Sequence, residues 1–247
     1  MKIILILVAL FATNCETKKS NNNNGAIAAF LLSSQNGCST SSAASIAGVS
    51  RTSFSFPSNC TSAGLAAIGF TGSNLNSDSK GITGTGTSSA MASLADFKPT
   101  GEKKQNIEVT FTLNASDAYL EVIGNATTIG SVASGPRFRV KPTTITILNQ
   151  NASGEATIGK SPPAAGTGTE RTYCLEIHEE NGAHMFGWSK ACSDLSTTER
   201  GNYEFDTDGF SSTNPGSKVG FILNKASIKS MIISSGKIGT SGAIFSL

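Results

Sequence analysis

Alternation of apolar and polar residues is the clearest signal in the second half of the chain. Residues 107–113 read IEVTFTL, with an apolar side chain at every second position. A period of two puts these side chains on one face of a β-strand. The same signal recurs at residues 119–123, 138–140, 144–148, 219–223, 228–233 and 243–245. We therefore expect a series of short strands joined by polar turns.

The segment 173–188 predicts a β-hairpin. Asn181-Gly182 is a strong signal for a two-residue turn, and a turn at these residues pairs Glu180 with Ala183. In this register the apolar side chains gather on one face, which carries Tyr173, Leu175, Ile177, Phe186 and Trp188. This agreement between the two strands supports the register.

The region before residue 106 gives weaker signals. It is rich in Ser, Thr, Gly and Ala, and its short apolar runs at residues 52–56 and 65–70 are interpreted as early strands between long loops. The glycine pattern at residues 81–87 lacks the strand-then-helix frame of a nucleotide-binding loop. We expect a single domain over residues 37–247, with a loop-rich N-terminal part over residues 37–105.

Roughly ten short strands with polar turns predict an all-β fold, an antiparallel β-sandwich of the jelly-roll type. The strand layout of residues 106–247 resembles the concanavalin-like and laminin-G-like sandwiches. The segments that carry this resemblance are YCLEIHEENGAHMFGW and the closing VGFIL. An immunoglobulin-like sandwich is the alternative.

The chain begins with Met1-Lys2 and a continuous apolar stretch over residues 3–11. This stretch is shorter than the roughly 20 residues of a membrane-spanning helix, and it fits a secretion signal. The following LFATNC resembles a lipobox, with Ala12 and Asn14 where the common form has Leu and Gly or Ala. It is closer to the relaxed form of spirochaetal lipoproteins.

The lipobox resemblance implies a signal peptide over residues 1–14 and fatty acylation of Cys15, of the palmitate type. Two or more acyl chains anchor a protein stably to a membrane. Residues 15–36 then comprise the lipidated cysteine and a flexible tether, because residues 16–25 are polar, of low complexity and unable to bury a core. The expected location is the cell envelope, at the outer membrane. The alternative is an ordinary secretory signal with Cys15 left as a free thiol.

Charge and composition narrow the class of partner. Without residues 1–14 the chain has 18 Lys and Arg residues, one fewer than its 19, against 17 Asp and Glu. No long basic run occurs, which argues against a nucleic acid partner. Charged residues make up only 15% of the chain, as in extracytoplasmic β proteins with many turns.

Cysteine number points to an oxidising compartment. With Cys15 lipidated, four cysteines remain: Cys38, Cys60, Cys174 and Cys192. An even number predicts two disulfides, and four cysteines allow three connectivities. We favour the pairs that are near in sequence, Cys38 with Cys60 and Cys174 with Cys192.

The strongest candidate for catalysis is the segment EIHEE. On a strand, Glu176, His178 and Glu180 share one face. The pattern resembles the acidic strand of family-16 β-sandwich glycoside hydrolases, in which one carboxylate attacks the sugar and another protonates the leaving group. Here His178 stands where that pattern has Asp. The alternative interpretation is a solvated strand face that ends at a turn.

A second candidate is a calcium site at Asp206 and Asp208. The sequence DTDG resembles part of a calcium loop, since Ca2+ takes several oxygen ligands. A strand ending in an Asp-Gly turn explains the same residues. His178 and His184 lie on opposite faces in the predicted hairpin, which argues against a site that uses both.

Together these features indicate a membrane-anchored lipoprotein with a β-sandwich binding domain. The expected ligand is a glycan, a host matrix component or another envelope protein. One alternative is an envelope glycoside hydrolase that uses Glu176 and Glu180. The other is a purely structural envelope lipoprotein.

Overall fold

A computed structural model describes residues 37–97, 104–148, 155–156, 163–179, 183–210 and 216–240. These residues belong to one compact unit, Ser33–Leu247. The expected signal peptide, the lipidated Cys15, the tether and the final strand at residues 243–245 lie outside the described residues. Within the described ranges, no helix has the length and apolar character needed to cross a membrane.

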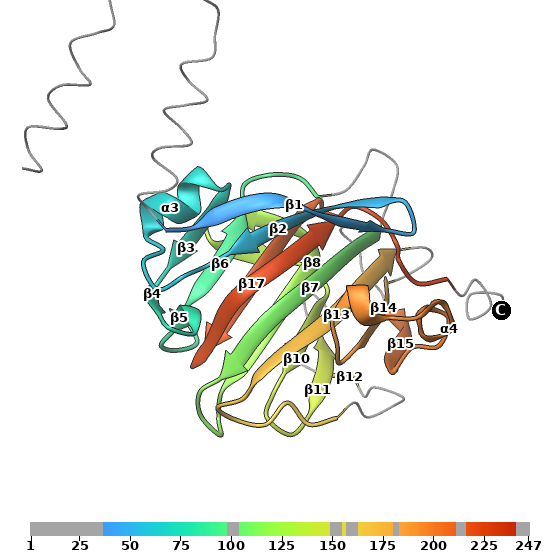
Figure 1. The fold of residues 1–247 in the computed structure, drawn as a ribbon. Coiled ribbons are helices and arrows are strands. Elements are labelled where there is room, and N and C mark those ends of the chain that lie inside the picture. The colour runs from blue at the N-terminus through green and yellow to red at the C-terminus, as the bar shows by residue number, and fades with distance from the viewer. Residues whose placement is uncertain are drawn as a thin grey trace, which may run out of the picture. The chain divides into compact units, whose positions relative to one another are not determined.

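The described strands form two antiparallel sheets (Figure 1). The nine-stranded sheet has the order β1 (Ser39–Ile46), β2 (Val49–Ser55), β17 (Ala226–Ser234), β7 (Lys104–Leu113), β13 (Glu170–Glu179), β14 (Ala183–Trp188) and β15 (Phe205–Phe210). In addition, β5 (Gly81–Gly84) pairs with β17, and β4 (Leu75–Asp78) pairs with β5. Strand β17, from the end of the chain, thus lies between β2 and β7.

The eight-stranded sheet has the order β12 (Glu155–Ala156), β11 (Ile145–Leu148), β10 (Arg137–Val140), β8 (Tyr119–Ile129), β16 (Lys218–Asn224), β6 (Ala90–Ser93) and β3 (Phe70–Ser73). Strand β9 (Val132–Ser134) pairs with the far end of β8. Sheets of nine and eight strands exceed an immunoglobulin-like sandwich, which has about seven to nine strands in all. The expected all-β antiparallel sandwich of the jelly-roll type is confirmed.

The main core lies between the facing sides of the two sheets. The alternation predicted for residues 107–113 is confirmed, because Ile107, Val109, Phe111 and Leu113 are all buried in this core. The eight-stranded sheet contributes Leu120, Val122, Phe138, Val140 and Phe221 from its inner face. Burial of these apolar side chains is the main force that holds the sheets together.

The register predicted for the 173–188 hairpin is wrong by one residue. Glu179 pairs with Ala183 and Glu176 with Phe186, so the connection has three residues, 180–182, and not two. A shift of one residue moves each side chain of one strand to the other face. Phe186 and Trp188 therefore lie on the outer face, while the expected inner residues of β13 remain in the main core.

The expected strand at residues 65–70 is also wrong in part. Residues Ser62–Ala67 form the short helix α3, and β3 begins only at Phe70. The Thr61 hydroxyl accepts a hydrogen bond from the Gly64 N–H at 3.1 Å, which satisfies one of the free donors at the helix start. Gly69, with a φ of 85°, then turns the chain into β3.

A second apolar cluster covers one end of the outer face of the nine-stranded sheet. It contains Cys174, Phe186, Trp188, Cys192, Leu195, Tyr203 and Ile238. The covering segments include the 3-10 helix η1 (Cys192–Asp194), the helix α4 (Thr197–Arg200) and the chain around Ile238. The Trp188 indole N–H donates to the Glu199 carbonyl at 2.9 Å, which fixes α4 over the sheet.

Both favoured disulfides are present. Cys38 is bonded to Cys60 beside α3, and Cys174 on β13 is bonded to Cys192 in η1. All four half-cystines are buried, at 4% exposure or less. The second disulfide fastens the covering segment to the outer face of the sheet.

Candidate functional site

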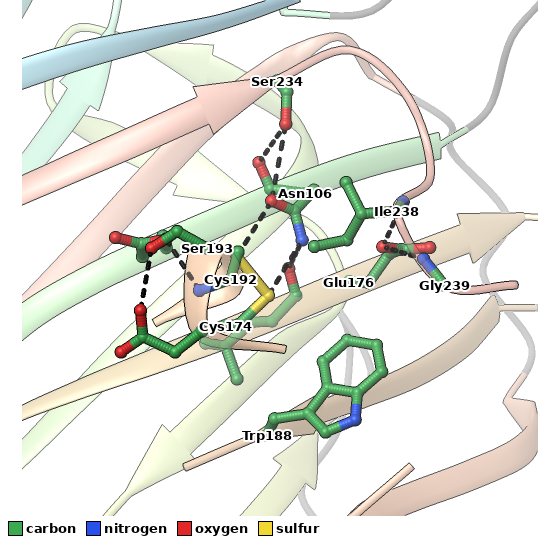
Figure 2. Close-up of a disulfide and its surroundings, with 12 residues drawn as sticks. Asn106, Cys174, Glu176, Trp188, Cys192, Ser193, Ser234, Ile238 and Gly239 are labelled. Carbon is green, nitrogen blue, oxygen red and sulfur yellow. Dashed lines mark hydrogen bonds between the residues drawn. A yellow bond between two sulfur atoms is a disulfide. The ribbon is translucent and has the colours of Figure 1, made fainter. Parts of the chain in front are cut away.

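Glu176 is completely buried, so the alternative interpretation of this segment as a solvated strand face is wrong at this residue. Its Oε2 atom accepts hydrogen bonds from the backbone N–H groups of Ile238, at 2.9 Å, and Gly239, at 3.3 Å. Its Oε1 atom lies 2.6 Å from Nε2 of His178, which is itself only 2% exposed. Figure 2 shows the carboxylate reaching toward the chain at residues 238 and 239. Glu176 and His178 do share a face, as expected.

These contacts give Glu176 a structural role. Both carboxylate oxygens have partners within the protein, and neither is open to a substrate. Buried charges are stable only when they are paired and hydrogen-bonded, and Glu176 meets this condition by holding the C-terminal segment against the sheet. The second acid of the expected catalytic pair, Glu180, lies outside the described residues.

The polar side chains around the Cys174–Cys192 disulfide also have their hydrogen-bonding partners within the protein. Asn106 Nδ2 donates to the Leu175 carbonyl at 3.2 Å and to Sγ of Cys174 at 3.4 Å (Figure 2). Next to it, Glu108 forms a 2.7 Å ion pair with Arg51 and accepts the Cys192 N–H at 2.8 Å. This region is a buried polar network under a covering segment, and it offers no open binding surface.

His178 and His184 pair directly across β13 and β14, so they share a face. Their expected separation onto opposite faces is wrong, for the same reason that the hairpin register is wrong. Even so, no group of three His, Cys, Asp or Glu side chains suited to a metal ion is found within the described residues.

The expected calcium loop is part of a strand. Residues Phe205–Phe210 form β15, and Asp206 pairs with Phe186. The chain therefore stays extended through Asp208 and Gly209, and it makes neither a loop nor an Asp-Gly turn at that point. Asp206 and Asp208 occupy alternate positions of this extended strand, which differs from the curved loop that the sequence pattern suggested.

A pocket opens at one end of the sandwich, and we call it the end pocket. Its volume is about 520 Å³, within the usual range for small-molecule sites. Three separate segments line it: the β1–β2 turn with the start of β2, the residues after β6, and the end of β17. The lining residues are Gly48, Val49, Ser50, Thr52, Asp96, Phe97, Ile233, Ser234 and Ser235.

The polar groups of the end pocket are well defined. Asp96 is exposed, and its carboxylate lies 3.1 Å from Nζ of Lys218 and also accepts a hydrogen bond from the Ser217 hydroxyl. Phe97 is half-buried and packs edge-on against Phe54, with ring centroids 6.0 Å apart. The carboxylate is thus positioned by two partners, and the ring is positioned by the core.

Hydroxyl groups complete the lining. Ser50, Thr52 and Ser235 are at least partly exposed at the pocket, whereas the Ser234 hydroxyl lies 3.4 Å from Asn106 Oδ1 on the outer face. No sequence pattern predicted this pocket. Its residues are far apart in the chain and form no motif, and the only early signal was the strand expected at residues 52–56.

No family model matches the sequence, and no curated protein matches it either. Among solved structures, the potassium-bound carbohydrate recognition domain of Emp46p is 10% identical, with a TM-score of 0.48 over 74% of this chain and 96% of that chain. The Ca2+/Man3GlcNAc-bound exoplasmic/lumenal domain of VIP36 is 10% identical, with a TM-score of 0.44 over 72% and 87%. The carbohydrate binding module CBM66 from Bacillus subtilis is 11% identical, with a TM-score of 0.40 over 68% and 92%. At sequence identities this low, the similarity does not assign a role to any residue of this chain.

Proposed function

We propose that the protein is a lipid-anchored component of the bacterial cell envelope whose β-sandwich binds a saccharide in the end pocket. The observation that carries this proposal is the lining of the pocket. A carboxylate, a phenyl ring and several hydroxyl groups converge on one opening of about 520 Å³.

This set of groups matches the chemistry of a sugar. A sugar ring presents hydroxyl groups along its edge and C–H groups on its faces. The Asp96 carboxylate can accept hydrogen bonds from sugar hydroxyls, and bonds to a charged acceptor are stronger than neutral ones. Phe97 offers an apolar surface beside it, and the hydroxyls of Ser50 and Thr52 can donate or accept. A few placed polar groups on an apolar wall are typical of small-molecule sites.

The proposed lipid anchor is inferred from the sequence of residues that lie outside the described part of the chain. The lipobox-like LFATNC and the polar tether after it favour acylation of Cys15 and attachment to the outer membrane. The two disulfides support an address outside the cytoplasm, because disulfides persist in oxidising compartments.

The anchor is tested by the mass of the N-terminal peptide of protein extracted from membranes. We expect a peptide that begins at Cys15 and carries acyl chains. An unmodified N-terminus at another residue would refute the anchor and would leave the end pocket as a separate claim.

The pocket is tested by saccharide binding to the full chain in detergent, using a panel of neutral mono- and oligosaccharides. We expect Asp96→Asn to weaken the binding of the best saccharide by about tenfold, since a hydrogen bond to a charged group contributes roughly 1.5 kcal/mol. The matched control is Asp194→Asn, which removes the same charge from an exposed residue in η1 that does not line the pocket.

Equal affinity in the Asp96→Asn and Asp194→Asn variants would show that the saccharide binds elsewhere. Absence of binding to every member of the panel would contradict the proposed function. In that case the host matrix or envelope protein partners, or a purely structural role, would account for the protein better.

A further inference from the structure

The outer face of the eight-stranded sheet carries a second cluster of charged and aromatic side chains, which the end pocket does not include. Tyr119 and Glu121 lie on β8, and Arg137 and Arg139 lie on the neighbouring β10. Lys141 follows directly after the end of β10 and is half-buried. We call these five residues the basic face.

The accessible part of this face is limited to one end of β8. At the other end, β9 folds over the sheet beside β16. A Cβ atom added to Gly220 would lie 2.2 Å from the Cβ of Ala133, so only glycine permits this approach. The arginine side chains on β10, at the other end of the face, keep partial exposure.

Glu121 organises the basic face. It is 1% exposed and accepts hydrogen bonds from both arginines. Oε2 accepts from Nη1 of Arg137 at 3.0 Å, and Oε1 accepts from Nε of Arg139 at 2.8 Å and from its Nη2 at 2.5 Å. One buried carboxylate thus fixes two guanidinium groups. Their side chains remain 17% and 25% exposed.

The Tyr119 ring packs against the guanidinium group of Arg139. The guanidinium carbon of Arg139 lies 4.9 Å from the centre of the Tyr119 ring, within the range of a cation–π contact. Such a contact, together with the ion pair, holds the guanidinium plane in one orientation before any ligand arrives. A preorganised group loses less conformational entropy on binding.

The ion pairs on this face leave an excess of positive charge. Arg137 and Arg139 contribute two positive charges, and Glu121, which is bonded to both of them, contributes one negative charge. Two positive charges less one negative charge leave this group of three side chains with a net charge of +1.

Arg137 has hydrogen-bonding capacity to spare. It uses Nη1 for Glu121 and Nε for the Gly135 carbonyl, at 3.4 Å. An arginine has five N–H donors in a planar fork. No described residue accepts a hydrogen bond from its Nη2, whose two N–H groups suit the oxygens of a carboxylate or a sulfate.

We propose that the basic face binds an acidic polysaccharide, one whose sugars carry carboxylate or sulfate groups. Arg137 and Arg139 occupy alternate positions of one strand, about 6.6 Å apart, and Lys141 follows the end of that strand. A linear polyanion can therefore meet more than one of them, whereas a single small anion cannot. Three cations on a nearly neutral chain are too few for the phosphate neutralisation that nucleic acid binding requires.

The test uses the full chain in detergent with four probes: heparin, polygalacturonate, the neutral polysaccharide dextran and single-stranded DNA. We expect binding to heparin and polygalacturonate, weakened by added salt, and no binding to dextran at this face. Arg137→Gln should weaken binding to the acidic probes by about tenfold, because it removes a charge-assisted hydrogen bond. The variant Arg137→Lys should lose less, since it keeps the charge.

Lys229→Gln is the matched control, because it removes one positive charge from the nine-stranded sheet, where Lys229 pairs with exposed Glu170. Equal losses in Lys229→Gln and Arg137→Gln would overturn the proposal, since overall charge would then explain the binding. DNA binding as tight as heparin binding, and equally sensitive to Arg137→Gln, would also overturn it. Thermal unfolding of each variant checks that a loss of binding is not a loss of fold.

Discussion

At the scale of single residues, three buried glutamates show how this sandwich tolerates charge. Glu108, Glu121 and Glu176 are 8%, 1% and 0% exposed. Each has partners that a buried carboxylate needs: a guanidinium for Glu108, two guanidiniums for Glu121, and two backbone N–H groups with His178 for Glu176. Loss of one partner from such a pair leaves an uncompensated buried charge, which is strongly destabilising.

Glu199, in contrast, is an exposed acid whose pKa is lowered in the folded protein. It closes a capping box with Ser196 at the start of α4. Its hydrogen bond with Lys190, followed by those with the backbone and side chain of Ser196, lowers the pKa of Glu199 from its ordinary value of 4.5 to about 2. The folded state thus favours the charged form.

From this shift we predict a pH window for the stability of α4. The pKa is lower in the folded protein, so the contribution of Glu199 is complete above pH 4.5 and is lost as the pH falls through about 2. Glu199→Gln keeps a capping box but cannot titrate. Thermal unfolding measured at stepwise pH should show the gap between wild type and variant closing over this window. A constant gap across it would contradict the assignment.

At the scale of elements, the C-terminal segment after β17 depends on one carboxylate. The Ile238 side chain is fully buried in the second cluster, and the N–H groups of residues 238 and 239 both donate to Glu176. We therefore predict that Glu176→Ala will speed amide hydrogen exchange at Ile238 and Gly239, because their acceptor is lost.

The exchange rates of core amides in β7 provide the internal reference for this variant, and Glu170→Ala is the matched control, since Glu170 pairs with Lys229 at the surface. Unchanged exchange at residues 238 and 239 would show that other contacts hold the segment. Faster exchange throughout the domain would show that Glu176 supports the whole sheet and not this segment alone.

The elements also show which parts of the fold the sequence predicts. Strand β7 was predicted because only one of its faces is apolar. Strand β14 was misplaced because both of its faces are buried, Met185 in the main core and Phe186 in the second cluster, so its sequence does not alternate. Helix α3 was read as a strand because a six-residue helix is too short to show its own periodicity.

The candidate sites, like the strands, could be predicted only where a local sequence pattern marks them. Glu176 stood out in the sequence because charged residues clustered near a strong turn signal, but its burial depends on segments 190–204 and 235–240, which are distant in the chain. The end pocket joins Ser50, Asp96 and Ser235, and no local pattern links such residues. The basic face was visible only in part, as the alternation of Arg137 and Arg139 in RFRV.

At the scale of the whole domain, the two outer sheet faces differ in how they are covered. Over β13 and β14 the outer face of the nine-stranded sheet is closed by the Cys174–Cys192 disulfide, α4 and the segment at Ile238. The outer face of the eight-stranded sheet presents Arg137 and Arg139 at intermediate exposure. Binding is therefore expected at the end pocket and on the basic face, and not at the acidic strand β13.

The most direct test of saccharide binding is a map of backbone amide chemical shifts as the best neutral saccharide from the panel is added. We expect shifts at Ser50, Thr52, Asp96, Phe97 and Ser235, which line the end pocket, with little change at Glu176. Shifts confined to β13 and β14, or no shifts at saturating saccharide, would contradict it.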